Sequence, residues 1–256
     1  MNRILSENER RDTVNDDLSL ITDTNGLTLG TDALLLASFI RGKETDRAAE
    51  LGSGTGILSM LVVTRKKAAS VLAFEIQEKY ATLSRRNVEE NRLSDRITVK
   101  KADIRSLTQS DDLIFGSFDT VFSNPPYMPA VGMRNRTDDN YIARHEVMGD
   151  IGDFCRAARK LLRYGGKFFL VHRPDRLSDI MAAMREEKLE PKRMTLVHAS
   201  PDVAPSLVLI EAVYGGKPDL RITRPFYIYK DIAHKEESDD YITVYETGIL
   251  FPEVKA

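Results

Sequence analysis

The sequence Asn124-Pro125-Pro126-Tyr127 contains the residues whose types and spacing are best suited to chemistry. An asparagine side-chain oxygen can accept one N–H of a primary amine, and the carbonyl of the next residue can accept the other. Proline at that position fixes φ and has no N–H of its own. The tyrosine ring offers a flat face on which a base or an amide stacks. The tetrapeptide therefore predicts a site that holds a planar amine for attack on an electrophile; its alternative interpretation is a simple turn after a strand.

A glycine-rich turn is the second candidate site. Residues 50–56 read Glu-Leu-Gly-Ser-Gly-Thr-Gly and lie between a short apolar run and an apolar helical pattern at 57–63. Glycines in such a turn let the backbone approach a ligand at the carboxyl end of a parallel strand. The G-x-G-x-G spacing differs from the G-x-G-x-x-G of dinucleotide-binding proteins. We therefore expect a nucleotide-like cofactor at this turn.

Acidic residues end the next two expected strands. Glu75 lies about 20 residues after the glycine turn, where an acid commonly accepts a hydrogen bond from a ribose hydroxyl. Asp103 ends the strand after that, and we expect it to hold the adenine amine of the cofactor. Each carboxylate has a simpler interpretation as a helix cap or a solvated strand end.

The elements that must position these residues alternate between strands and helices. Strands are expected at 47–51, 71–76, 97–102, 118–123 and 167–172, followed by a pair at 194–199 and 207–214, and helices at 57–63, 77–93, 150–162 and 177–188. This alternation predicts an α/β fold with a parallel sheet that ends in an antiparallel hairpin. Asp150 is expected to cap the start of its helix and Gly165 the end.

The two flanking segments are expected to pack on this sheet. An Asn25-Gly26 hairpin turn and a helix capped by Thr31 would cover the cofactor cleft. Aromatic runs at 226–229 and 241–245 predict an added strand pair. We therefore expect three parts, at 1–46, 47–216 and 217–256.

Composition limits the remaining function classes. The 256 residues carry a net charge of −2, so no global basic field indicates nucleic acid. The single cysteine, Cys155, has an amphipathic context typical of packing, and no Cys/His spacing predicts a metal site. No signal peptide or membrane span is evident. We expect a cytoplasmic protein without a metal; its oligomeric state is open, and a monomer is compatible with the sequence.

From residue 30 to 216 the chain resembles the class I S-adenosylmethionine-dependent methyltransferases, and Asn124 to Tyr127 resembles their amino-methylating subset. The resemblance implies a Rossmann-like, seven-stranded, mostly parallel sheet with a reversed last strand and helices on both faces. It implies S-adenosylmethionine as cofactor and Asn124, Pro125, Pro126 and Tyr127 as catalytic residues. The implied cofactor-binding residues are Glu50, Gly52, Ser53, Gly54, Thr55, Gly56, Glu75, Ile76, Asp103, Ile104, Asn124, Thr31 and Asp32.

Three substrates are considered. Residues 30–37, Gly-Thr-Asp-Ala-Leu-Leu-Leu-Ala, resemble the bacterial tRNA adenine-N6 methyltransferases that modify valine tRNA at adenine 37, beside the anticodon, as do residues 142–146 and 171–174. A tRNA partner is therefore expected, contacted by Arg134, Arg136 and Arg144. The alternatives are glutamine-N5 methylation of a release factor and guanine-N2 methylation of rRNA, whose enzymes usually carry domains that this chain lacks. A non-enzymatic S-adenosylmethionine-binding module is a further alternative. His145 and His172 are expected to be structural.

Overall fold

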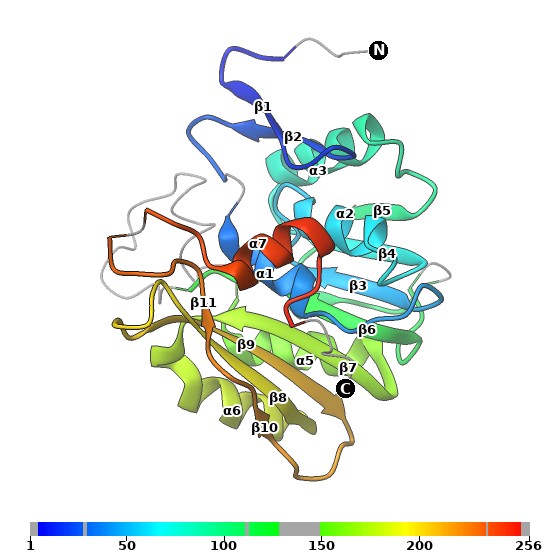
Figure 1. Cartoon of the computed structure of the whole chain (residues 1–256). Coiled ribbons are helices and arrows are strands. Elements are labelled where there is room, and N and C mark those ends of the chain that lie inside the picture. The colour runs from blue at the N-terminus through cyan, green and yellow to red at the C-terminus, as the bar shows by residue number, and fades with distance from the viewer. Residues whose placement is uncertain (1–4, 28–29, 111–112, 128–148, 234, 252–256) are drawn as a thin grey trace, which may run out of the picture.

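The computed structural model describes residues 5–27, 30–110, 113–127, 149–233 and 235–251 (Figure 1). The strands are β1 (Glu9–Thr13), β2 (Ser19–Asp23), β3 (Arg47–Leu51), β4 (Ser70–Glu75), β5 (Ile97–Lys101), β6 (Phe118–Ser123), β7 (Leu162–His172), β8 (Leu189–His198), β9 (Pro205–Tyr214), β10 (Arg221–Ile222) and β11 (Phe226–Tyr227). The helices are α1 (Thr31–Phe39), α2 (Ile57–Thr64), α3 (Glu78–Glu90), α5 (Ile151–Leu161), α6 (Leu177–Glu186) and α7 (Asp239–Thr247), with short 3-10 turns η1 (Ile104–Ser106) and η3 (Pro174–Arg176).

The central sheet confirms the predicted α/β class. Its main strands lie in the order β8-β9-β7-β6-β3-β4-β5, and the pairs from β7 to β5 are all parallel. β9 runs antiparallel to both β7 and β8, so the last strand of the expected seven is reversed. The two-residue strands β10 and β11 pair parallel with β8 and extend the sheet beyond the seven that the sequence predicts.

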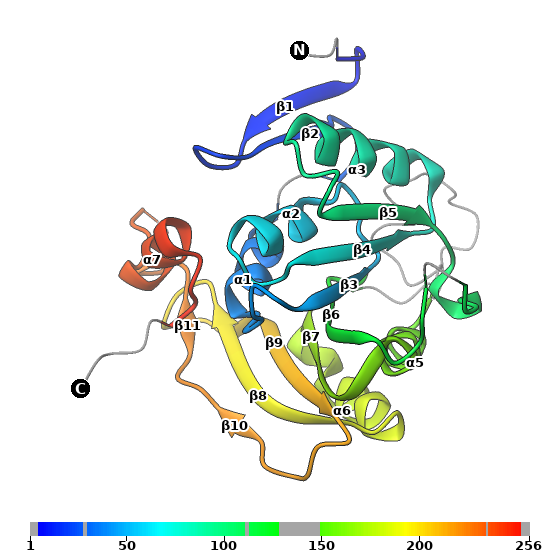
Figure 2. The ribbon, with the colours of Figure 1, turned by 90° about the vertical axis from the view of Figure 1, so that its right-hand side faces the viewer.

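Helices cover both faces of the sheet because its central strands are apolar on both sides. In β7, Phe169 and Val171 belong to the apolar cluster that includes α1 and α2, whereas Phe168 and Leu170 belong to the cluster that includes α5 and α6. Figure 2 shows α5 and α6 on the opposite side of the sheet from α1 and α2. This period-2 alternation in one strand holds the two helical layers to a common sheet.

One predicted helix cap is confirmed and two are wrong. Asp150 accepts a hydrogen bond from the backbone N–H of Asp153 at 2.9 Å, which begins α5. Gly165 does not cap that helix, because α5 ends at Leu161 and passes directly into β7, where Gly165 has φ +78°. Thr31 is the first residue of α1 and not its cap; Gly30 occupies the cap position, without a side chain to donate or accept.

The expected Asn-Gly hairpin is also wrong in position. A hairpin does precede α1, but β1 and β2 are joined at residues 14–18, where the Asn15 side-chain oxygen accepts the N–H groups of Asp17 and Leu18. Asn25-Gly26 forms the next turn, in which the Asp23 carboxylate accepts the Asn25 N–H at 2.9 Å. That turn precedes helix α1 and does not join two strands. The sequence therefore correctly predicted a turn at Asn25-Gly26 but wrongly predicted that it closes a hairpin.

The tail was half correctly predicted. Phe226 lies in β11, as the aromatic alternation suggests, but residues 241–245 lie in α7. The Ser238 hydroxyl accepts the N–H of Tyr241 at 3.0 Å and begins this helix. Tyr241 and Val244 are its buried residues, spaced by three. Alternating and helical apolar patterns overlap in so short a segment, and the helix cap decides between them.

Two asparagines, Asn87 on α3 and Asn91 at its carboxyl cap, form hydrogen bonds with β2 along the edge where a neighbouring strand would pair. The Asn87 side chain accepts the N–H of Ile21 at 2.7 Å and donates to its carbonyl at 3.0 Å. Asn91, one turn later, repeats the pair with Ser19, at 3.0 and 2.8 Å. Residues 19 and 21 point to the same side of β2, and the cap residue 91 follows residue 87 by about one helical turn, so the two asparagines face alternate residues of the strand. Asn87 also donates to the Thr55 carbonyl, which ties the hairpin to the glycine turn.

Replacing Asn87 with Ala should destabilise the protein by about 3 kcal/mol, because it leaves the buried N–H and carbonyl of Ile21 without partners. Asn91→Ala is the matched control: it breaks the same pair of bonds at a half-buried position, where water replaces them, and should cost about 1 kcal/mol. Urea unfolding followed by circular dichroism measures both. Equal losses in the two variants would contradict the assigned role of Asn87.

Candidate functional site

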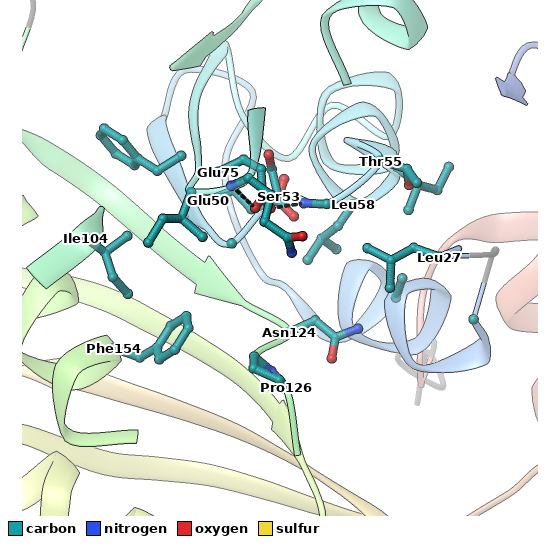
Figure 3. A pocket seen from close by; sticks show the side chains of 18 of the residues that line it. Leu27, Glu50, Ser53, Thr55, Leu58, Glu75, Ile104, Asn124, Pro126 and Phe154 are labelled. Atoms are coloured by element: carbon teal, nitrogen blue, oxygen red, sulfur yellow. Dashed lines mark hydrogen bonds between the residues drawn. The ribbon is translucent and has the colours of Figure 1, made fainter. Parts of the chain in front are cut away.

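A cavity of about 310 Å³ opens at the carboxyl edge of β3, β4, β5 and β6. Figure 3 shows Asn124 and Pro126 on one side of it and Glu50, Ser53 and Glu75 on the other, with Ile104 and Phe154 at a third margin. The predicted site residues that line the cavity are Asp32, Glu50, Gly52, Ser53, Gly54, Thr55, Glu75, Ile76, Asp103, Ile104, Asn124 and Pro126. Thr31, Gly56, Pro125 and Tyr127 lie beside lining residues without bordering the cavity themselves.

The glycine turn wraps the end of β3. Gly52 and Ser53 both donate to the Phe74 carbonyl at 2.9 Å, so the turn is tied to β4. Gly54 and Gly56 have φ of +51° and +84°, a region that favours glycine. A Cβ on Gly56 would lie 2.4 Å from the Ser84 hydroxyl, which shows how closely α3 approaches. The turn therefore presents backbone, not side chains, to much of the cavity wall.

Two buried carboxylates face this turn. Glu75 accepts the N–H of Gly54 at 2.8 Å and of Gln77 at 2.9 Å. Glu50 is 2% exposed and accepts hydrogen bonds from both the backbone N–H and the hydroxyl of Ser59, in the first turn of α2. Burial raises the pKa of both groups, that of Glu50 to about 8, and the nearby Glu75 adds to the shift of Glu50. A cavity with two such groups favours a cationic or hydroxyl-bearing ligand.

Asp103 has a partner of its own. Its carboxylate receives the Arg105 guanidinium at 2.6 to 3.0 Å and caps the short turn η1, and these bonds lower the pKa of Asp103. The side chain still lines the cavity.

The predicted catalytic tetrapeptide directly follows β6. The Ser123 hydroxyl donates to the Leu51 carbonyl at 2.7 Å, which fixes the end of β6 to the start of the glycine turn. The Tyr127 hydroxyl lies 2.7 Å from the Asp32 carboxylate and 2.5 Å from the Asn124 side-chain oxygen. Burial, together with the charge of Asp32, raises the pKa of Tyr127 well above its usual value, so the phenol keeps its proton.

His172 packs against the tyrosine ring, with ring centroids 5.2 Å apart. Its Nδ1 accepts the N–H of Arg173 at 2.8 Å, and burial lowers the pKa of His172 to about 4. A neutral ring in this position supports Tyr127 by packing. Within the described part of the chain, no group of three His, Cys, Asp or Glu side chains is arranged to hold a metal ion.

Several lining residues were missed by the sequence reasoning. Gly26, Leu27 and Ala33 come from the segment before β3, and Phe154 comes from α5. Gly26, Leu27 and Ala33 are consistent with the expectation that the amino-terminal segment covers the cleft, although the sequence did not single them out as lining residues. Phe154 reads as an ordinary core position in an amphipathic helix, so no local signal distinguishes it.

The expected substrate contacts Arg134, Arg136 and Arg144, and also His145, lie outside the described residues. In the tail, Arg224 is paired with Asp240, and Lys230 lies 3.3 Å from Asp239. These tail cations therefore pair with acids of the tail itself. No helix in the described ranges is long and apolar enough to cross a membrane.

A parallel sheet of this strand order, with a reversed last strand and a glycine-lined cavity at its carboxyl edge, defines the chain as a class I S-adenosylmethionine-dependent methyltransferase. The family model described as "Methyltransferase small domain" matches residues 25–187, which is more than half of the chain. The chain belongs to that family.

Curated relatives and solved structures agree with this assignment. A tRNA1(Val) (adenine(37)-N6)-methyltransferase of Porphyromonas gingivalis is 30% identical over 192 residues, covering 72% of this chain and 73% of that protein. One from Bacteroides fragilis is 26% identical over 220 residues, covering 86% and 90%. The crystal structure of a predicted O-methyltransferase from Agrobacterium tumefaciens superposes with a TM-score of 0.70 at 25% identity, covering 86% of this chain and 98% of that one.

The raised pKa of Glu50 predicts a pH-dependent affinity for the cofactor. In the free enzyme Glu50 is protonated below about pH 8, and a cation bound in the cavity favours its ionised form, so binding releases a proton. The dissociation constant should therefore fall as pH rises, by up to about tenfold per unit, and become constant above pH 8.

Calorimetry of S-adenosylmethionine binding, in buffers of different ionisation enthalpy, measures both the affinity and the proton release. Glu50→Gln is the control, because any pH dependence that comes from the cofactor's own amine persists in it. An identical pH profile in the two proteins would contradict the assignment to Glu50.

Proposed function

We propose that this enzyme transfers a methyl group from S-adenosylmethionine to the exocyclic N6 amine of an adenine in tRNA, at adenine 37 of tRNA(Val). The observation that carries the proposal is the position of Asn124 and Pro126 directly after β6, on the cavity side opposite the two buried carboxylates (Figure 3). The names of the relatives in Porphyromonas and Bacteroides support the choice of substrate.

The residues of the cavity fit this cofactor. The Ser53 hydroxyl is buried and has no hydrogen-bond partner among the described residues, so a ligand group would satisfy it. A Cβ on Gly54 would lie 3.0 Å from the Leu27 side chain, so there is little room for a side chain at residue 54. The backbone of Gly54 therefore forms this part of the cavity wall. Glu75 offers carboxylate oxygens for ribose hydroxyls, and the negative charge of ionised Glu50 suits a cationic ligand. When bound, S-adenosylmethionine supplies an electrophilic methyl group on a sulfonium sulfur.

The chain's own residues position the amine. A planar amine has two N–H groups, and the Asn124 side-chain oxygen and the Pro125 carbonyl supply two acceptors. Acceptors on both protons favour a pyramidal nitrogen whose lone pair points at the methyl group. Attack needs no general base, because the proton is lost afterwards from the cationic product. Positioning therefore supplies most of the rate enhancement. A base within folded RNA must turn outward to reach the cavity.

The other parts of the chain are assigned as follows. The segment 1–46 covers the cavity, 47–216 is the methyltransferase domain, and 217–256 packs on the same domain. Contacts from Arg65 to the Val244 carbonyl and from Lys67 to the Gly248 carbonyl support the last assignment. A tRNA substrate supports a cytoplasmic location. Arg134, Arg136 and Arg144, which lie outside the described residues, are proposed to contact RNA phosphate.

Two other methyl-accepting substrates are alternatives to adenine, and the structural relative suggests a third. A release-factor glutamine or an rRNA guanine also presents a planar amine to two acceptors. The names of the relatives in Porphyromonas and Bacteroides favour an adenine over both of them. The relative from Agrobacterium is described as an O-methyltransferase. A hydroxyl has a single proton and does not use the second acceptor at Pro125, so the tetrapeptide favours an amine.

Asn124→Ala should lower the rate of methyl transfer by at least about 100-fold, because the amine loses one of its two acceptors. The affinity for S-adenosylmethionine should stay within about threefold, since the glycine turn, Glu50 and Glu75 are unchanged. Single-turnover transfer of a labelled methyl group and cofactor calorimetry measure the two quantities. Wild-type turnover in the variant would refute the role of Asn124.

The substrate is identified by incubating the enzyme with labelled S-adenosylmethionine and total tRNA from a strain that lacks it. We expect label in N6-methyladenosine of one tRNA, identified by nucleoside mass spectrometry. Release factor and rRNA are supplied in parallel reactions. Label in glutamine or in N2-methylguanosine alone would replace the proposed substrate with that acceptor.

A further inference from the structure

The Tyr127 hydroxyl lies between two oxygen atoms, the Asp32 carboxylate at 2.7 Å and the side-chain oxygen of Asn124 at 2.5 Å. A phenol carries one proton and can donate one hydrogen bond. The carboxylate oxygen of Asp32 and the amide oxygen of Asn124 are both acceptors. One of the two short contacts is therefore left without a proton, and two oxygens with facing lone pairs repel each other.

Rotation of the Asn124 amide by half a turn removes this conflict, because it exchanges the oxygen for the NH₂ group. Asn124 then donates to the Tyr127 oxygen, and Tyr127 donates to Asp32. Every group has one partner of the correct type. The high pKa of Tyr127 means that the phenol keeps the proton that this sequence of bonds requires. The rotation also moves the amide oxygen of Asn124 to the side away from Tyr127.

We propose that Asp32 is a positioning residue that acts through the Tyr127 hydroxyl to orient the Asn124 amide, so that its oxygen faces the cavity and accepts the substrate amine. This proposal rests on the proposed function, in which Asn124 holds an amine. It assigns Asp32 a role other than cofactor binding, and it assigns the Tyr127 hydroxyl a role separate from stacking by the ring. The opposite orientation would present a donor to an amine, which is itself a donor.

The surroundings hold both ends of this chain of hydrogen bonds. Asp32 lies in the first turn of α1, where its other oxygen accepts the N–H of Ala33 at 2.9 Å. A carboxylate is favoured at the amino end of a helix. The Tyr127 ring packs on His172, and Asn124 follows a strand end that Ser123 fixes to Leu51. The Asp32 carboxylate and the Tyr127 hydroxyl thus belong to residues 95 apart in sequence.

Four variants test the proposal by activity. Tyr127→Phe keeps the ring and removes the hydroxyl, and Asp32→Ala removes the acceptor. Each should lower kcat by about 30-fold at saturating cofactor, with the S-adenosylmethionine dissociation constant within about threefold of wild type. The double variant should be no slower than Tyr127→Phe alone, because both changes break one pathway. Asp32→Asn should be at least about fivefold faster than Asp32→Ala, because an amide oxygen still accepts the phenol proton.

Two results would overturn the proposal. Multiplicative losses in the double variant would mean that Asp32 and Tyr127 act independently. A loss of cofactor affinity of more than about tenfold in Asp32→Ala, with kcat unchanged, would make Asp32 a cofactor ligand.

A substrate-free measurement separates this proposal from the proposed function. In ¹⁵N-labelled enzyme, the side-chain NH₂ signals of Asn124 are the pair lost in Asn124→Ala. Tyr127→Phe should shift that pair, because the ring and its ring current are retained and only the hydrogen-bond partner is lost. An unchanged pair refutes the hydrogen-bond chain. A shifted pair with no methylation of any amine supports the chain and refutes the proposed function.

Discussion

The site depends on one constraint, which is that neighbouring parallel strands end at the same edge of the sheet. Leu51, at the end of β3, is aligned with Phe74 in β4 and with Ser123 in β6. The hydrogen bond from the Ser123 hydroxyl to the Leu51 carbonyl holds the ends of β6 and β3 together. The glycine turn follows the first of these positions and Asn124 the last, so two segments about 70 residues apart border one cavity. Parallel pairing of central strands thus determines that the glycine turn and Asn124 line the same cavity.

Much of this arrangement could be predicted from local sequence. The glycine turn, Glu75 and the tetrapeptide at 124–127 each follow a short apolar run, and the carboxyl ends of parallel strands share an edge. The reversed β9 was predictable as well, because only a short turn separates it from β8 and a parallel crossover needs a longer connection. These predictions succeed because each depends on residues close together in the chain.

The errors and omissions have a common physical cause. Residues 241–245 have spacings compatible with either a strand or a helix, and the Ser238 cap selects the helix. Gly165 follows a helix but lies inside β7, because α5 passes into that strand without a loop. The contact between Asp32 and Tyr127 and the exposure of Phe154 to the cavity depend on tertiary packing. No pattern in the sequence specifies which distant side chains meet.

Helix α1 holds Asp32, a residue outside the central sheet, in the position that its proposed role in orienting the Asn124 amide requires. Asp32 is at its amino end, and cations hold its carboxyl end. The Lys67 ammonium donates to the carbonyls of Ala37 and Ser38 at 2.6 and 3.0 Å. Arg193 donates to the Phe39 carbonyl at 2.7 Å and lies 3.6 Å from the centre of the Phe39 ring.

Cations at the carboxyl end of a helix and a carboxylate at its amino end both interact favourably with the helix dipole. Lys67 also donates to the Gly248 carbonyl, so the same ammonium joins α1 to the segment after α7. The described part of the tail therefore helps to fix the helix that carries Asp32, although none of its residues lines the cavity. A side chain can select one orientation of a neighbouring amide only if its own backbone does not move. The hydrogen bonds from Lys67 and Arg193 at the carboxyl end of α1 supply that rigidity to Asp32.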